Sequence, residues 1–115
     1  MRNDSYRSEK FIFRVIGASD ELVENVLNVL GDSLVRVNNY YKNKDIVVVS
    51  VEIKQGVDYS EFVSLVKNSK IEKKKCGLFA SLVTDRDSSG ISVPDFVLDI
   101  FFEIGYSLDF SYTFV

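Results

Sequence analysis

Residues 85–90 place oxygen-bearing side chains at alternate positions before a glycine. Calcium-binding loops begin in this way, because carboxylate and hydroxyl oxygens coordinate the ion and the glycine permits a sharp turn. The twelfth position of that pattern requires a bidentate glutamate, but it is Phe96 here, and Asp95 is one place out of register. We therefore expect an ordinary turn held by local hydrogen bonds and no metal site.

Cys76 follows three consecutive lysines, and nearby positive charge can lower the pKa of a thiol enough to form a reactive thiolate. The chain holds no second cysteine and no histidine to assist such a thiolate. We expect Cys76 to be a small buried residue that enters a strand.

The basic residues Lys70 and Lys73 to Lys75 could contact phosphate, but the net charge of −3 favours a solvated loop or a gatekeeper beside a hydrophobic strand.

The absence of histidine excludes several kinds of catalytic site. Ser-His-Asp and Cys-His centres and histidine-containing zinc sites cannot be built, and one cysteine is too few for a cysteine-only zinc site. Carboxylates, lysines and tyrosines could still transfer protons, but no two of them stand out as a tuned pair. We therefore expect neither enzymatic activity nor a bound cofactor.

A helix expected in the last quarter of the chain carries the pattern that we single out. Asp95, Asp99 and Glu103 are four residues apart and form an acidic stripe. The opposite side is apolar and consists of Phe96, Val97, Ile100, Phe101 and Ile104. Leu98 and Phe102 do not fit this division. At about 100° of rotation around the helix axis per residue, Phe102 lies directly beside the acidic stripe and outside the main apolar arc. Such a mixture is typical of a surface that binds a basic protein, although a helix packed between the sheet and a loop would also be apolar over most of its circumference.

The acidic character of the chain is regional. No Lys or Arg follows Arg86, so the last 29 residues carry −5, whereas the first 86 carry +2, because 14 basic residues there oppose 12 of the 17 acidic ones. A negative field beside apolar groups speeds and orients association with a cationic partner. We therefore predict a partner-binding site that consists of Asp87, Asp95, Leu98, Asp99, Phe102 and Glu103.

Glycines separate segments of different period in the first half of the chain. A period of two over residues 11–16 predicts a largely buried strand, and a helix follows from an N-cap at Ser19 to Gly31. Strand patterns over residues 34–41 and 46–53, joined by a short polar loop, predict an antiparallel hairpin.

The second half continues with alternating helices and strands. Asp58 and Glu61 resemble a capping box and predict a second helix, and residues 78–84 predict a fourth strand. The third helix is predicted from an N-cap at Ser92 to about Ile104, and after it apolar and polar residues alternate strictly. This alternation predicts an antiparallel last strand with one solvent-exposed face. The apolar residues of this strand are Leu108, Phe110, Tyr112 and Phe114.

The predicted order of elements is βαββαβαβ, and its first six elements match the split βαβ arrangement of ferredoxin-like folds. We therefore predict one α+β domain over residues 1–115, with a mainly antiparallel five-stranded sheet and three helices on one side of it. The lone cysteine fits a reducing compartment, and neither an apolar leader nor a membrane span is present in the sequence. The expected location is the cytoplasm.

Residues 90–114 contain a predicted serine-capped helix, a glycine and then Leu108, Asp109, Phe110 and Tyr112. This pattern resembles the C-terminal part of a bacterial family of small uncharacterised α+β domains. Phe13, Val15, Gly17 and the acidic start of the first helix are similar as well. Small acidic proteins without histidine also resemble the immunity proteins of bacterial toxin systems, such as contact-dependent growth inhibition, which block a toxin domain by binding it.

The second resemblance implies an immunity protein that binds and neutralises a cognate toxin domain, such as a basic nuclease. Carboxylates of the third helix would pair with cationic groups of the toxin, and Phe102 and Leu98 would serve as apolar anchors. No nucleic acid, membrane or cofactor would take part, and the oligomeric state stays open. The alternative is a small-ligand-binding or regulatory dimerisation module, because split βαβ domains often pair their edge strands.

Overall fold

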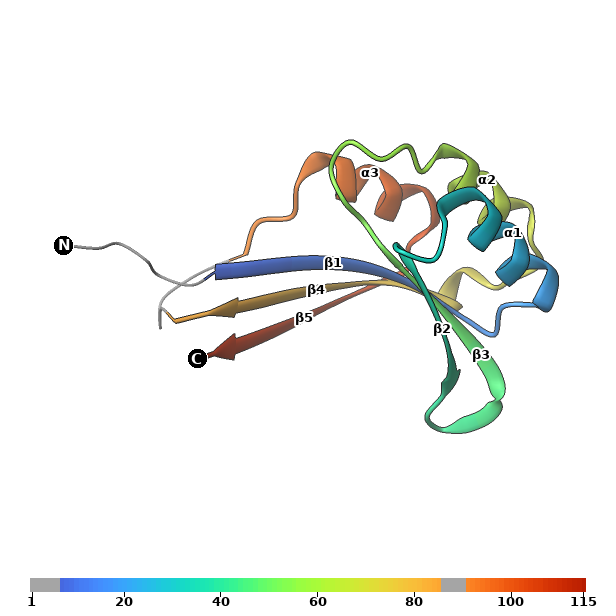
Figure 1. Cartoon of the computed structure of the whole chain (residues 1–115), viewed down its shortest axis with the longest axis horizontal. Helices are drawn as coiled ribbons and strands as arrows, with labels where there is room; N and C mark the ends of the chain where they lie inside the picture. The colour runs from blue at the N-terminus through green and yellow to red at the C-terminus, as the bar shows by residue number, and fades with distance from the viewer. Residues whose placement is uncertain (1–6, 86–90) are drawn as a thin grey trace.

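The computed structural model describes residues 7–85 and 91–115, which form a five-stranded sheet with three helices on one face (Figure 1). The elements are β1 (Arg7–Ile16), α1 (Asp20–Leu30), β2 (Val35–Tyr40), β3 (Asn43–Glu52), α2 (Ser60–Asn68), the 3-10 turn η1 (Lys73–Lys75), β4 (Cys76–Thr84), α3 (Asp95–Ile104) and β5 (Ser107–Phe114). The predicted order βαββαβαβ is confirmed.

The strands lie in the order β2-β3-β1-β4-β5. Strands β1 to β4 pair antiparallel with one another and reproduce the split βαβ arrangement. The fifth strand pairs parallel with β4, from Gly77 beside Ser107 to Thr84 beside Phe114. The α+β class and the mostly antiparallel sheet are confirmed, but the antiparallel direction predicted for the last strand is wrong. Helix α3 carries the chain back to the end of the sheet at which β4 began, so β5 must run parallel to β4.

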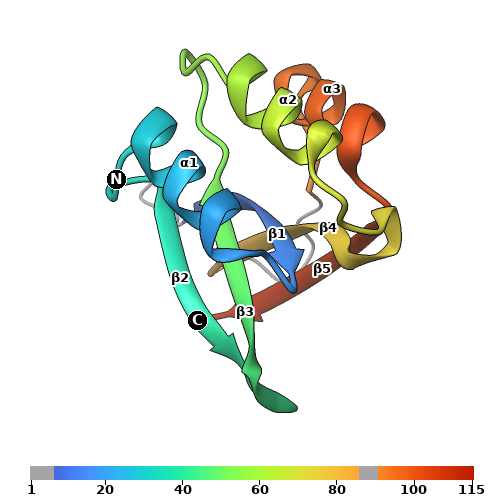
Figure 2. The same ribbon diagram turned by 90° about the vertical axis from the view of Figure 1, so that its right-hand side faces the viewer.

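The core fills the space between the helices and the face of the sheet that they cover, which we call the helix-side face. Viewed along the sheet, α1, α2 and α3 follow one another across this face (Figure 2). Apolar side chains of β1, β3 and β4 alternate inward to meet them, as the period of two predicts. The largest fully buried apolar side chains are Phe13, Phe62, Leu78, Leu82, Val15, Val26, Val49, Val51 and Val97.

Two of the three helix starts differ from the prediction. The Ser19 side chain accepts from the Leu22 amide at 3.2 Å, so the first predicted cap is confirmed, and the helix ends at Gly31 with φ 82°. The capping box predicted for α2 is wrong: its N-cap is Tyr59, and the Asp58 carboxylate instead accepts from the amide and hydroxyl of Ser60.

The third helix begins at Asp95 with Pro94 as its N-cap, so the N-cap predicted at Ser92 is also wrong. A residue that precedes proline is disfavoured in the helical region, so the helix cannot include Val93 and begins after the proline. The β2–β3 connection is also shorter than predicted, because Tyr40 pairs with Asn43 and most of the polar loop joins β3.

Replacing Tyr59 by phenylalanine lowers the free energy of unfolding by about 1–3 kcal/mol. The buried Tyr59 hydroxyl donates to the Glu52 carbonyl and accepts from the Lys54 amide, both at 2.8 Å. The substitution removes both bonds and leaves two backbone groups without their partner. Urea denaturation measures the loss, and Tyr106→Phe, at an exposed position, serves as the control. Equal stability of the two variants would contradict this role of the hydroxyl.

Candidate functional site

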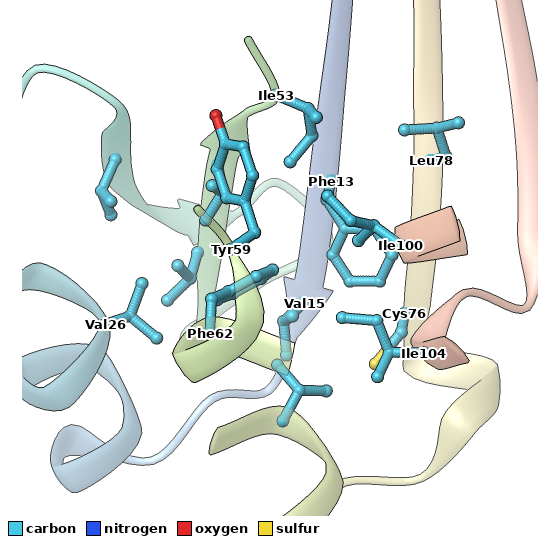
Figure 3. Close-up of a cluster of buried hydrophobic side chains, with 14 of the residues drawn as sticks. Phe13, Val15, Val26, Ile53, Tyr59, Phe62, Cys76, Leu78, Ile100 and Ile104 are labelled. Atoms are coloured by element: carbon cyan, nitrogen blue, oxygen red, sulfur yellow. The ribbon is translucent and has the colours of Figure 1, made fainter. Parts of the chain in front are cut away.

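Helix α3 has one buried side, which packs on β4 and α2. Val97, Ile100 and Ile104 on this side belong to the hydrophobic core, and Phe96 and Phe101 flank them as half-buried residues. Figure 3 shows Ile100 and Ile104 beside Phe13 and Cys76. The apolar side predicted from the helical period therefore faces the sheet.

The outer side of α3 carries the predicted mixture of charge and aromatic surface. Asp95 and Asp99 are exposed, Leu98 is half-buried, and the Phe102 ring is 69% exposed although it lies 5.9 Å from the Phe101 ring. Among the described residues, neither Asp95 nor Asp99 has an ion-pair partner. We call Asp95, Leu98, Asp99 and Phe102 the α3 outer surface.

Glu103 does not belong to this surface. Its carboxylate forms an ion pair with the Lys67 ammonium of α2, and both side chains are half exposed. The hydrogen bond from Lys67, together with its charge, lowers the pKa of the Glu103 carboxyl. The predicted acidic stripe is thus divided: Glu103 ties α3 to α2, while two carboxylates stay available. Asp87, the other predicted site residue, lies outside the described residues.

Replacing Lys67 by alanine raises the pKa of Glu103 back toward its ordinary value of 4.5. Since the folded pKa is depressed, the pair stabilises the fold above the unfolded pKa and loses this effect as the pH falls through the folded pKa. The stability change is small because both partners are exposed. A pH titration of the Glu103 side-chain carbon signal by NMR measures the shift. An unchanged midpoint in Lys67→Ala would contradict the ion pair.

Strand β5 carries a row of large apolar side chains that sequence reasoning assigned to a covered face. Leu108, Phe110, Tyr112 and Phe114 are in register with Leu78, Ala80, Leu82 and Thr84 of β4, which are all buried on the helix-side face. The β5 side chains on that face are nevertheless exposed, Phe110 by 55% and Phe114 by 59%. Helix α3 packs over β4, so the row on β5 lies beyond the helical layer.

The opposite face of the sheet has a shallow hollow with charged walls. Arg14, Lys74, Lys75 and Asp109 line it, and the Arg14 guanidinium stacks 4.7 Å above the centroid of the Phe79 ring. A side chain at Gly77 would collide with the Ser107 hydroxyl, which would have to rotate away. This hollow could receive a small anion.

Cys76 is buried at the start of β4, as predicted. Burial raises the pKa of its thiol, and the charge of Lys73 opposes that rise only in part. The thiol is therefore not an activated nucleophile. The neighbouring lysines form the exposed turn η1, where the Lys74 ammonium lies 3.2 Å from the Glu72 carboxylate.

Metal-binding groups of side chains and membrane-spanning helices are both absent from the described ranges 7–85 and 91–115. No group of three or more cysteine, aspartate or glutamate side chains there could hold a metal ion. The loop 85–90 begins like a calcium-binding loop, and its residues 86–90 lie outside the described residues. None of the helices within those ranges has the length and apolar character needed to span a bilayer.

Comparison of the chain with protein-family models, curated proteins and solved structures found no match. The resemblances of its C-terminal pattern and its composition therefore stay predictions.

Proposed function

We propose that this protein is an immunity-type inhibitor that binds and neutralises a cationic toxin domain, such as a nuclease, through the α3 outer surface. The observation that supports the proposal best is Phe102, an exposed phenylalanine on the same side of α3 as two carboxylates without ion-pair partners in the described ranges. Aromatic anchors beside complementary charges dominate the affinity of many interfaces.

The inhibition is steric and electrostatic. Asp95 and Asp99 pair with Lys or Arg side chains that the toxin uses to hold its own substrate, and Phe102 fills an apolar pocket between them. The bound helix then covers the substrate site of the toxin. Such a mechanism requires no cofactor and no bond-making residue on this chain, and we expect it to act in the cytoplasm.

The test pairs this chain with the product of the neighbouring gene, purified as a tagged protein. We expect the two to co-purify as a stoichiometric complex, and we expect co-expression of this chain to restore the growth of cells that produce the neighbouring product. A neighbouring product that is harmless, or that is toxic but not bound, would overturn the proposal.

The alternative proposal is a ligand-binding module that uses the hollow lined by Arg14, Lys74 and Lys75. Its three cations outnumber the one carboxylate, Asp109, and the net positive charge beside the Phe79 ring would suit a small anionic metabolite. A thermal-shift screen with anionic metabolites separates the two proposals, because a ligand that binds only the folded state raises the melting temperature. Stabilisation that is lost in Arg14→Ala would favour the module over the inhibitor.

A further inference from the structure

The two edges of the sheet are built differently. Strand β2 has six residues, exposes polar side chains such as Arg36 and Asn38, and loses its regular register at Asn39 and Tyr40. Short, polar and irregular edges discourage pairing with another chain. Strand β5 has eight residues, contains no lysine, arginine or proline, and keeps an unbroken register with β4. The β5 sequence therefore lacks most of the features that prevent an edge strand from pairing with another chain.

An exposed apolar surface lies beside the β5 edge. Phe110, Tyr112 and Phe114 are between 48% and 59% exposed. At about 200 Å² for each aromatic side chain, these three expose roughly 320 Å². A stable interface covers about 800 Å² on each partner, and the backbone edge of β5 and Leu108 add to the aromatic area.

The chemistry of this surface favours a second copy of the chain over a cationic partner. The apolar row on the helix-side face of β5 includes no carboxylate, because Asp109 points to the opposite face of the sheet. There Asp109 lines the hollow that Arg14, Lys74 and Lys75 also line. A cationic segment would find no charged partner in this row. A second copy presents an identical apolar row and an identical edge strand, which match each other about a twofold axis.

We propose that two copies of this protein associate through their β5 strands, which pair antiparallel about a twofold axis and join the two sheets into one of ten strands. The twofold axis passes near Phe110 and Ser111. An axis at Asp109 would set two carboxylates directly opposite each other, which is unfavourable, whereas an axis at either of the next two residues places Asp109 opposite a serine or threonine. The apolar rows of the two copies then meet at the centre of the continuous sheet.

This proposal does not rest on the proposed function. The α3 outer surfaces stay exposed on both copies, and the test uses this chain alone without any toxin. Failure of either proposal is therefore distinguishable from failure of the other.

The experiment measures the mass of the full chain by sedimentation equilibrium over a range of concentrations. We expect wild type at twice the monomer mass of 13.1 kDa, and Phe110→Lys at the monomer mass, because it places two ammonium groups at the centre of the interface. The matched control is Val37→Lys, at an exposed helix-side position of the opposite edge strand, and we expect it to stay dimeric.

A second variant tests the same interface in case Phe110→Lys fails to fold. The Val115 amide donates to the Thr84 carbonyl in register with the β4–β5 ladder. By alternation along the strand, the Ser111 amide points toward β4 and the Leu108 amide points away from it. Leu108→Pro therefore blocks pairing at the outer edge while the ladder with β4 persists, and we expect a folded monomer by circular dichroism. A monomeric wild type, larger open assemblies, or dimers that persist in the folded variants would overturn the proposal.

Discussion

Replacing Phe62 by alanine lowers the free energy of unfolding by about 3–5 kcal/mol. Phe62 is fully buried in α2, and its ring meets the Phe13 ring edge to face, with 5.8 Å between the centroids and 81° between the planes. Figure 3 shows this pair at the centre of the cluster that joins α2 to β1. Alanine removes the buried ring and leaves a cavity that the surrounding side chains fill only in part. Such a loss is a large share of the roughly 5–15 kcal/mol that stabilises a domain.

Urea denaturation followed by circular dichroism measures this loss. The control is Phe102→Ala, which makes the same substitution at an exposed position and changes the free energy by less than about 0.5 kcal/mol. Similar losses in the two variants would show that Phe102 is packed as Phe62 is, and would contradict both the described core and the α3 outer surface.

Reversing both carboxylates of the α3 outer surface weakens binding of the neighbouring gene product at least about 100-fold. Removing one partner of a desolvated charge pair costs about 2–5 kcal/mol, and about 2.8 kcal/mol corresponds to 100-fold. The Asp95→Lys/Asp99→Lys variant also places two cations opposite the cations of the partner. Because neither aspartate has an ion-pair partner within the described residues, we expect the fold itself to persist.

The chain offers a matched control for this double reversal. Asp20 and Glu24 are the first and fifth residues of α1, as Asp95 and Asp99 are of α3, and both are exposed. Asp20→Lys/Glu24→Lys therefore makes the same change in net charge and in the same positions of a helix. Isothermal titration should show near wild-type affinity for this control. Equal losses in the two variants would mean that net charge, and not the α3 outer surface, determines binding.

The fold could be predicted because its signals are local. Apolar alternation in β1 and β3 and the cap at Ser19 each depend on neighbouring residues, and they place the elements in order. The direction of β5 depends instead on how α3 returns the chain, which alternation alone does not contain. The start of α3 was missed because Pro94 restricts the residue before it, an effect that outweighs the capping preference of Ser92.

The candidate site was predicted in part. Helical geometry alone placed Phe102 beside the acidic stripe, and the structure exposes it. The pairing of Glu103 with Lys67 depends on α2 lying next to α3, which no local pattern encodes. The exposure of the apolar row on β5 could have been predicted from the number of elements. Three helices cannot cover one whole face of five strands, and a strand at the edge of the sheet is the one that they leave uncovered.

Amide chemical-shift mapping tests the central proposal most directly. The isotopically labelled chain is titrated with the purified product of the neighbouring gene, and the NMR signals of each amide are followed. We predict that the largest shifts fall on α3 around Asp95, Asp99 and Phe102, and that the amides of α1 stay unchanged. Tight binding with shifts confined to α1 or to the β2 edge, and none on α3, would contradict the account.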